Sequence, residues 1–449
     1  MTFSIDLHSP NDGSLIDTVP VATAEEVESA VRFAHERQPR WARVDADERG
    51  EALRRAARAL RDEAASLAER NEAETGRPRG EALDGVLAGA ATLEQYAELG
   101  PVHRGRSLRG AFSATDLMVP EPRGVVVVLT PWNDPVAVAC GLIGAALVAG
   151  NTVIHKPSER CPRTGALLGN IIAGTHPDGV LQHLDGDSTV GATLAADPDV
   201  DVIAHVGSTA TGRSIAESAA RTGAKTLLEN GGNDPLVVDG DVDPQWAAEQ
   251  AAAGAFANCG QICTAVERIY VHRRISEPFL DALASEATRR DLPPLVDVTH
   301  RDQVHEQVAE AVRLGARLRA GGTVPSGAGA HYPATVLTGC EPQMRVLAEE
   351  TFGPVAPVRV IEGFDQGLAE AARDRYGLAA TVLTASMEHA QRAWRALPVG
   401  TVKINAVFGG APGGAAEPRG DSGHGFGFGP ELLDELSTTK VVHIGHPGS

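Results

Sequence analysis

Two short glycine-containing segments carry the residues with the most distinctive chemistry in this chain. Cys263 ends the segment 258–263, Asn-Cys-Gly-Gln-Ile-Cys, and Glu229 begins the segment 229–232, Glu-Asn-Gly-Gly. A thiolate is a strong nucleophile, and a carboxylate can activate the water that releases a product bound to a thiol. These residue types predict covalent catalysis, with Cys263 as the nucleophile and Glu229 as the base.

Two more polar turns follow short apolar runs. Pro-Trp-Asn at 131–133 comes after the run 125–129, and Lys-Pro-Ser-Glu at 156–159 comes after the run 152–155. Continuous apolar runs of this length are typical of strands that are covered on both faces. Lysine is scarce in this chain, so a lysine within a proline-bounded turn suggests a role that suits an ammonium group.

The composition excludes several classes of partner. A chain of 449 residues with 43% hydrophobic residues can bury a large core, and its length favours two or more domains. The net charge of −19 argues against nucleic acid and anionic membranes as partners, because both need a basic surface. The longest uncharged stretch, 135–152, is shorter than a typical membrane span and predicts a buried helix.

The cysteines fit a reducing compartment. The chain begins with neither a basic nor an apolar segment, so we expect a cytoplasmic protein without a secretory signal or a disulfide framework. Cys140, Cys161 and Cys340 are expected as small buried hydrophobic residues. Cys259 and Cys263 could bind a metal as a pair, but no second Cys/His pair has a suitable spacing. We therefore expect no metal site, and Cys259 packed in the core.

The middle of the chain predicts a parallel sheet flanked by helices. From residue 124 to residue 229, short apolar runs alternate with helical patterns. The expected strands are 125–129, 152–155, 180–184 and 202–205, and the expected helices are 135–148, one from about 162 and one from 208 or 209. The last of these helices begins after a Gly-Ser-Thr turn, where free N–H groups and the helix dipole can hold a phosphate.

The flanking regions predict further helices and strands. The first stretch is expected to be helical, because Thr23 and Glu26 form a capping box, and a longer amphipathic helix begins near Asp47 and is broken at Pro101. A helix from 243–244 to about residue 258 should deliver Cys263 just beyond its end, and 268–272 predicts a strand. The tail 440–444 predicts a terminal edge strand that could pair with another subunit.

Six segments together resemble the aldehyde dehydrogenase superfamily, in the family's order and over nearly the whole chain. They are 131–133, 156–159, the Gly-Ser-Thr turn at 207–209, Glu229 with 231–232, 260–263 and 349–355. The resemblance implies an α/β protein with a Rossmann-like NAD-binding domain, a second α/β catalytic domain and a small β oligomerisation element. The matching boundaries are 1–100 and 122–230 for the first, 231–415 for the second, and 101–121 with 416–449 for the third.

The resemblance also implies a reaction. In the family, the cysteine that matches Cys263 attacks the aldehyde carbon, and the amide that matches Asn133 holds the oxyanion together with the N–H of Cys263. Hydride then passes to the nicotinamide, and Glu229 activates the water that hydrolyses the thioester. We expect NAD-dependent, irreversible oxidation of an aldehyde to a carboxylate.

The cofactor contacts are expected along the same segments. Lys156 and Glu159 match positions that bind the adenosine ribose, and the carboxylate of Glu159 would repel a 2′-phosphate, which favours NAD over NADP. Ser208 matches the pyrophosphate contact, and Glu350 matches the contact to the ribose on the nicotinamide side. The remaining cofactor candidates lie beside these residues, and they are Trp132, Ser158, Gly207 and Phe352.

Some residues depart from the family's pattern. The family often has leucine at Asn230, an aromatic residue at Asp134 and threonine at Val206, and the usual Pro-Phe-Gly-Gly segment is shortened here to 418–420. Asp134 and Arg419 would then replace apolar groups near the substrate tunnel. Asp134 points to cationic aldehydes and Arg419 to anionic ones, so the substrate stays open.

Two alternatives accompany this interpretation. A CoA-acylating relative would pass the acyl group to a thiol, although Glu229 argues for hydrolysis. Asn230 and the shortened segment 418–420 leave open the alternative that the chain is an inactive nucleotide-binding relative. The terminal strand and the resemblance both suggest a homodimer or a homotetramer.

Overall fold

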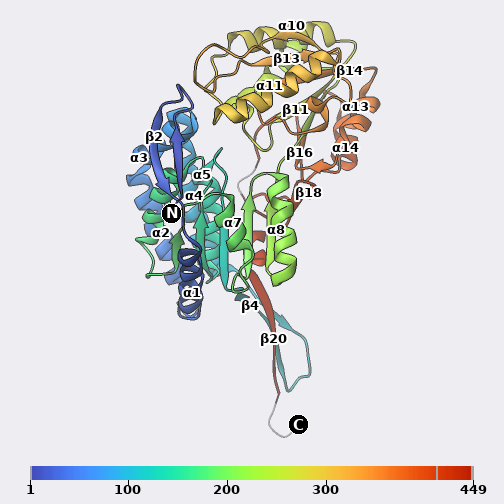
Figure 1. The fold of residues 1–449 in the computed structure, drawn as a ribbon. Helices are drawn as coiled ribbons and strands as arrows, with labels where there is room; N and C mark the ends of the chain where they lie inside the picture. Colours follow the sequence, from blue (N-terminus) through green and yellow to red (C-terminus); the bar gives the residue numbers. More distant parts are fainter. Residues whose placement is uncertain (1–2, 411–412, 446–449) are drawn as a thin grey trace.

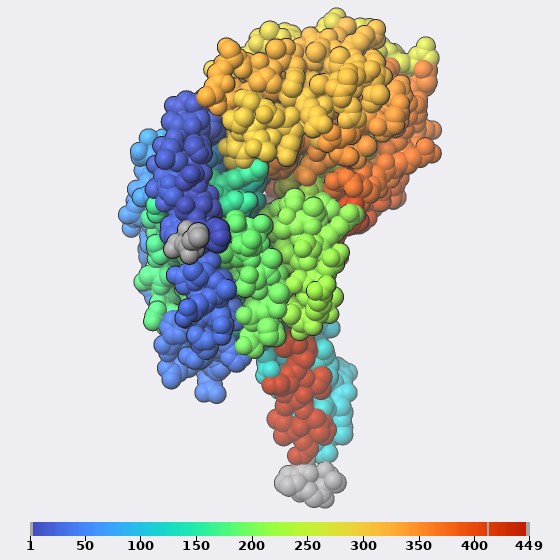
Figure 2. Space-filling model, in the orientation of Figure 1, coloured from blue at the N-terminus to red at the C-terminus, as the bar shows by residue number. Residues whose placement is uncertain are grey.

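The computed structural model describes residues 3–410 and 413–445 and has a mixed α/β fold. Two lobes, each built on a sheet, lie one above the other, and a thin ribbon of strands projects from the far end of the lower lobe (Figure 1). Figure 2 shows the blue and green lower lobe meeting the yellow and orange upper lobe, with the red residues 437–444 in the projecting ribbon. The α/β class predicted from the sequence is confirmed.

The lower lobe contains a six-stranded sheet in the order β19-β9-β8-β5-β6-β7. The five strands between residues 125 and 229 run parallel to one another, and β19 pairs with β9 in the antiparallel direction. The strands are β5 (Val125–Leu129), β6 (Thr152–Lys156), β7 (Leu181–His183), β8 (Val202–Val206), β9 (Lys225–Glu229) and β19 (Gly423–His424). The four strands predicted between 125 and 205 are confirmed, with a shorter β7.

Helices cover both faces of this sheet, because successive side chains of each buried strand point in opposite directions. Val126 and Val128 of β5 pack in one core, whereas Val125 and Val127 pack in a second core with three helices. The helices that contribute to the first core include α2 (Ala46–Asp62), α3 (Ala64–Thr75), α4 (Arg79–Val102), α5 (Pro135–Val148) and α6 (Pro162–Ala173). The helices of the second core are α1 (Ala24–Trp41), α7 (Ser188–Ala195) and α8 (Thr209–Thr222).

The N-terminal stretch is only partly helical. The capping box of Thr23 and Glu26 is confirmed at the start of α1, and the amphipathic helix near residue 47 is α2. A two-stranded hairpin precedes them, formed by β1 (Ser4–His8) and β2 (Leu15–Pro20). The expectation of helix from the beginning was wrong here, because residues 3–8 alternate between apolar and polar side chains, which is the period of a strand and not of a helix. Helix α4 also continues through Pro101 and ends at Val102.

The upper lobe contains a seven-stranded sheet in the order β12-β13-β14-β11-β10-β16-β17, in which only β12 pairs antiparallel. Its strands are β10 (Asp234–Val238), β11 (Val266–His272), β12 (Arg317–Ala320), β13 (Thr335–Thr338), β14 (Val355–Ile361), β16 (Ala379–Leu383) and β17 (Thr401–Ile404). The helices of this lobe are α9 (Pro244–Phe256), the 3-10 helix η1 (Ala257–Gly260), α10 (Ser276–Arg289), α11 (Val298–Arg313), α12 (Arg345–Ala348), α13 (Phe364–Ala371) and α14 (Met387–Ala396).

The C-terminal part of the chain contributes strands to three different sheets. β18 (Arg419–Gly420) pairs with β15 (Tyr376–Gly377), β19 completes the lower sheet, and α15 (Glu431–Glu435) packs into the lower core. The projecting ribbon is a three-stranded antiparallel sheet of β3 (Arg106–Leu108), β4 (Thr115–Pro122) and β20 (Ser437–Ile444). Within the described ranges, no helix combines the length and apolar character needed to cross a membrane.

Candidate active site

The residues predicted to take part in catalysis lie where the two lobes meet. Glu229 is the last residue of β9, and the turn 130–134 follows β5, so both stand at the carboxyl ends of parallel strands. This edge is the usual binding edge of a doubly wound sheet. Cys263 comes from the upper lobe, in the turn between η1 and β11.

The turn before Cys263 has an unusual backbone. Asn258, Cys259 and Gly260 adopt positive φ angles of 45°, 57° and 72° in succession. Such angles cost free energy for residues with a Cβ and are held only where the surroundings enforce them. A Cβ on Gly260 would lie 2.1 Å from the carbonyl oxygen of Gly353, so the two loops are in backbone contact. The cysteine loop is thereby held against the loop that follows Glu350.

The thiol of Cys263 is strongly disfavoured as a thiolate in this structure. Its pKa is raised to about 12, mainly by burial and also by the acidic groups of Glu229, Asp234 and Glu350, while Lys403 opposes them. The residue as a whole is half-buried. At neutral pH the group is therefore a thiol, and it must lose its proton to a base before it can attack a carbon.

Glu229 has the properties of such a base. Burial raises its pKa to about 7, and a hydrogen bond from the backbone N–H of Gly427 to Oε1, at 3.1 Å, partly offsets this effect. A Cβ on Gly427 would lie 2.5 Å from the same oxygen. A carboxylate that titrates near neutral pH accepts a proton more readily than an ordinary glutamate. Its charge also acts on the Cys263 thiol.

The side chain of Asn133 reaches from the lower lobe to the cysteine loop. Its Nδ2 donates to the carbonyl oxygen of Gln261 at 3.0 Å, two residues before Cys263. The backbone carbonyl of Asn133 accepts from Arg77 Nη1 at 3.2 Å and from Asn258 Nδ2 at 3.4 Å. The amide donor is therefore positioned from both lobes, close to the loop that carries Cys263.

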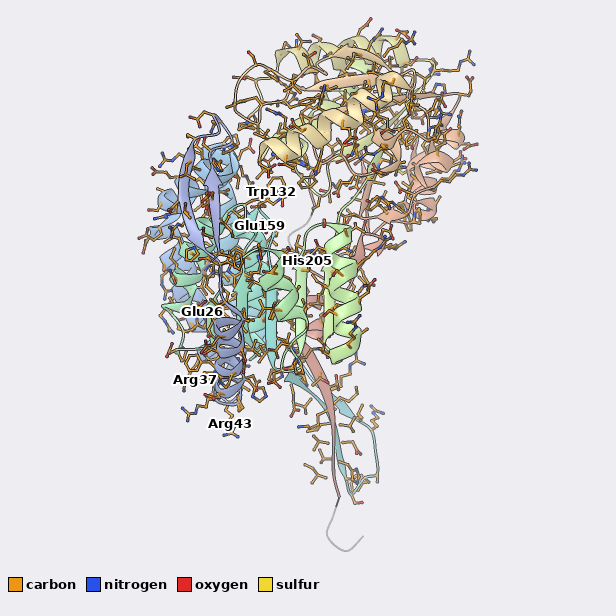
Figure 3. All side chains as sticks on the ribbon, viewed as in Figure 1. Glu26, Arg37, Arg43, Trp132, Glu159 and His205 are labelled. Atoms are coloured by element: carbon orange, nitrogen blue, oxygen red, sulfur yellow. The ribbon has the colours of Figure 1, made fainter. Side chains whose placement is uncertain are left out.

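The residues expected at the adenosine end lie at the last position of β6 and in the turn that follows it. Lys156 is buried, its Nζ donates to the carbonyl of Pro157 at 2.7 Å, and burial lowers its pKa. Glu159 is exposed and acts electrostatically on Lys156, and the hydroxyl of Ser158 accepts from the N–H of Arg160. The labelled Glu159 lies at the upper edge of the lower lobe (Figure 3).

The Gly-Ser-Thr turn opens α8 as expected. Ser208 is the N-cap, and its hydroxyl accepts from the N–H of Thr211 at 3.2 Å. The N–H groups of the first turn point out of the helix and can bind an anion together with the dipole. An exposed helix start beside Gly207 fits a phosphate of a dinucleotide, because glycine has no side chain of its own to cover the backbone.

The residues expected at the nicotinamide end come from both lobes. Glu350 Oε1 accepts from the N–H of Gly232 at 3.1 Å, and burial raises its pKa to about 7. The rings of Trp132 and Phe352 form an edge-to-face pair with centroids 5.5 Å apart. His300 completes this cluster, since its Nε2 lies 2.7 Å from the carbonyl oxygen of Phe352. Trp132 is labelled at the junction of the lobes in Figure 3.

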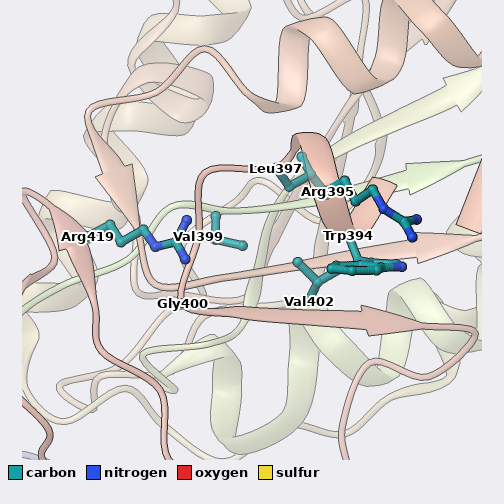
Figure 4. A pocket seen from close by; sticks show the side chains of 7 residues that line it. All are labelled: Trp394, Arg395, Leu397, Val399, Gly400, Val402 and Arg419. Atoms are coloured by element: carbon teal, nitrogen blue, oxygen red, sulfur yellow. The ribbon is translucent and has the colours of Figure 1, made fainter. Parts of the chain in front are cut away.

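The two substrate candidates lie in different environments. Asp134 forms an ion pair with Arg77, at 2.8 Å, and packs against Gly85 of α4. Arg419 is exposed on β18 and lines a hollow whose other walls are Trp394, Arg395, Leu397, Val399, Gly400 and Val402 (Figure 4). No candidate catalytic residue lines that hollow.

Three residues that help to form the site could not be recognised from the sequence. Arg77 holds the Asn133 turn, Gly427 holds Glu229, and Glu267 binds the N–H groups of Thr351 and Phe352 at 2.8 and 2.9 Å. Glu267 is buried, which raises its pKa to about 8. All three act through contacts between distant parts of the chain. The spacing of residue types along the sequence cannot show such contacts.

Comparison with known proteins identifies the family. The model of the aldehyde dehydrogenase family matches residues 2–442. Similar structures include lactaldehyde dehydrogenase from Escherichia coli, with 29% identity and a TM-score of 0.95 over 99% of this chain and 96% of that one. A 3,6-anhydro-L-galactose dehydrogenase in complex with NADP has 31% identity and a TM-score of 0.95, with 99% and 96% covered. A point mutant of betaine aldehyde dehydrogenase from Staphylococcus aureus, in complex with NAD+, has 28% identity and a TM-score of 0.95, with 99% and 93% covered. This chain therefore belongs to the aldehyde dehydrogenase family and is an oxidoreductase that oxidises aldehydes with a nicotinamide dinucleotide.

Proposed function

We propose that the protein oxidises an aldehyde to a free carboxylic acid, with NAD as acceptor and Cys263 as the nucleophile. The observation that carries this proposal is the convergence of the Cys263 turn, the Asn133 amide and the Glu229 carboxylate at the junction of the lobes. The test is the stoichiometry of the reaction. One NADH and one molecule of free acid should form for each aldehyde consumed.

The thiol of Cys263 begins the reaction. Its proton leaves to Glu229, and the sulfur adds to the aldehyde carbon to form a thiohemiacetal. The amide of Asn133 and the backbone N–H of Cys263 stabilise the oxygen that becomes negative, which is usually the largest single contribution in this type of site. The dinucleotide, when bound, supplies the acceptor for the hydride that leaves this carbon, and a thioester to Cys263 remains.

Hydrolysis of the thioester completes the cycle. Glu229, with a pKa near 7, takes a proton from water as the water attacks the thioester carbon, and the acid departs from the sulfur. This base is the reason to favour hydrolysis over transfer to coenzyme A. Added coenzyme A is expected to leave the product as free acid, whereas formation of acyl-CoA would support the acylating alternative.

Replacing Asn133 by alanine is expected to lower kcat/KM by about 10²-fold, because a preorganised oxyanion donor contributes roughly this much. The binding of NAD should not change, since the amide faces the cysteine loop. Steady-state kinetics and NAD titration measure the two effects. A matched control is Gln182→Ala, which removes an amide from the far strand β7. Equal activity of the Asn133 variant and wild type would contradict the oxyanion role.

We further infer that NAD is preferred over NADP, with Glu159 as the main discriminator. Replacing Glu159 by glutamine should shift the ratio of kcat/KM for NAD over NADP towards NADP by about tenfold, because a unit charge near a phosphate in water contributes about this factor. Glu388→Gln, which changes an exposed glutamate on α14, serves as the control. An unchanged ratio of kcat/KM for NAD over NADP in the Glu159 variant would show that this carboxylate does not select the cofactor.

We also infer a separate function for each lobe. We infer an NAD-binding domain from 1–100 and 122–230, a catalytic domain from 231–415, and an oligomerisation element from 101–121 and 416–449. The separate sheets support the first two, and the projecting ribbon supports the third. Of the described residues 416–445, β20 joins that ribbon, while β18 and β19 join the other parts of the molecule.

We infer a homodimer or a homotetramer in the cytoplasm. Strand β20 is an edge strand that exposes Val441 and Ile444, with exposed fractions of 65% and 57%, and such an edge is suited to pairing with another chain. Strand β17 is likewise an edge strand, at one end of the seven-stranded sheet. The five cysteines are free thiols, which supports a reducing compartment.

The ion pair with Arg77 changes the expectation for Asp134. A carboxylate that is already neutralised attracts a cationic aldehyde less than a free one. We infer that Asp134 orders the turn that carries Asn133, since Arg77 contacts both residues. A role for Arg419 in binding substrate stays a prediction from the sequence.

A further inference from the structure

His205 is a buried histidine whose ring nitrogens have no protein partner. It lies in β8, and 6% of its surface is exposed. Within residues 3–410 and 413–445, neither Nδ1 nor Nε2 makes a hydrogen bond. Its pKa is lowered to about 4, mainly by burial; the Ser208 backbone beside the ring opposes this shift and Lys156 adds to it. The imidazole is therefore neutral near pH 7, with one donor nitrogen and one acceptor nitrogen.

The ring points towards the N-terminus of α8. A Cβ on Gly207 would lie 2.6 Å from Cε1 and 2.9 Å from Nε2 of His205, so this edge of the ring occupies the space that a side chain at position 207 would fill. Ser208, the N-cap of α8, follows directly. Glycine at 207 leaves the ring and the free N–H groups of the helix facing the same space.

The sheet register places His205 on the cofactor edge. His205 pairs with Leu129, and Leu129 pairs with Lys156, so all three side chains lie in one row at the carboxyl ends of the strands and point to the same face. Figure 3 shows the labelled His205 below Trp132 and beside α8. Polar groups that are buried without a partner are rare, and a bound ligand is one reason to retain them.

We propose that His205 is a cofactor-binding residue that donates a hydrogen bond from its neutral ring to an oxygen of the dinucleotide's diphosphate. The proposal rests on the nicotinamide-dinucleotide site described above, and adds a contact that the six recognised segments do not contain. The donor acts beside the N–H groups of the first turn of α8, so that ring and helix bind the same anion. A histidine at this place gives the chain a donor where an apolar ring would only fill space.

The test is the affinity for ADP-ribose and for adenosine, measured by displacement of fluorescent NADH from the wild-type protein and from three variants. His205→Phe keeps an aromatic ring but removes the donor, and should weaken ADP-ribose about tenfold. Adenosine has no phosphate and should bind both proteins alike. His205→Gln returns an N–H near the position of Nε2 and should restore most of the affinity.

His176→Phe is the control, because His176 is a half-buried histidine that packs on Trp41 and does not belong to β8 or α8. Its affinity for ADP-ribose should equal that of the wild type. Equal affinity of His205→Phe and wild type for ADP-ribose would overturn the proposal and leave the proposed function intact. An equal loss for adenosine would also overturn it, since the contact would then not be to the diphosphate. Failure of the wild-type protein to bind NADH would overturn both.

Discussion

Replacing Cys263 by alanine is expected to abolish aldehyde-dependent formation of NADH, with a loss of about 10⁴-fold or more in kcat, because no other group can form the covalent intermediate. The measurement is absorbance of NADH over a panel of aldehydes. The variant should still bind NAD, since the thiol lies on the upper lobe and the expected adenosine contacts lie on the lower one.

Cys340→Ala is the control for this experiment. Cys340 is a buried thiol in the core formed with α11 and α12, so its loss should affect stability slightly and activity little. Turnover by Cys263→Ala at a rate near that of the wild type would show that Cys263 is not the nucleophile. A wild-type protein that binds NAD but oxidises no aldehyde on the panel would favour the inactive nucleotide-binding alternative.

Replacing Glu229 by glutamine is expected to lower steady-state turnover by about 10³-fold, as is typical for loss of a general base. Glutamine keeps the size of the side chain and can still accept the hydrogen bond from Gly427, so the loop should hold its shape. Rapid-mixing experiments separate the two steps that the base serves. Loss in the first turnover reports on the thiol proton, and loss only in later turnovers reports on hydrolysis.

The pH dependence gives a second check on the same residue. The pKa of Glu229 is raised to about 7, so below that pH the group is a neutral acid that cannot accept a proton. The rate of the wild-type enzyme should therefore rise as the pH increases through about 7, and this rise should be absent in Glu229→Gln. A wild-type profile that rises only at pH values where an ordinary glutamate titrates would contradict the assignment.

The local elements could be predicted from the sequence because their signals are local. The apolar run of β5, the proline at the start of α5 and the N-cap Ser208 each specify their element through nearby residues. The N-terminal hairpin was missed although residues 3–8, Phe-Ser-Ile-Asp-Leu-His, alternate with the period of a strand, and residues 10–13, Pro-Asn-Asp-Gly, are typical of a turn. The strand pattern is short, and the stronger helical pattern that begins at Thr23 was extended over it.

The candidate site could be predicted only in part for a related reason. Cys263, Glu229 and Asn133 stand in recognisable segments, but the residues that position them do not. Arg77 contacts a turn 56 positions later in the chain, and Gly427 contacts a residue 198 positions earlier. Such contacts arise from the fold as a whole, so no window along the sequence reveals them.

The bond from Gly427 to Glu229 has a consequence for biosynthesis. The strand that bears Glu229 borders on residues near the C-terminus, which supply both β19 and the backbone N–H that holds the carboxylate. Domains generally fold as they emerge from the ribosome, N-terminal parts first. A nascent chain that has been translated only as far as β17 therefore lacks both β19 and the N–H group that binds Glu229. With Glu229 as the proposed base, we expect activity only after residues 423–427 have joined the fold.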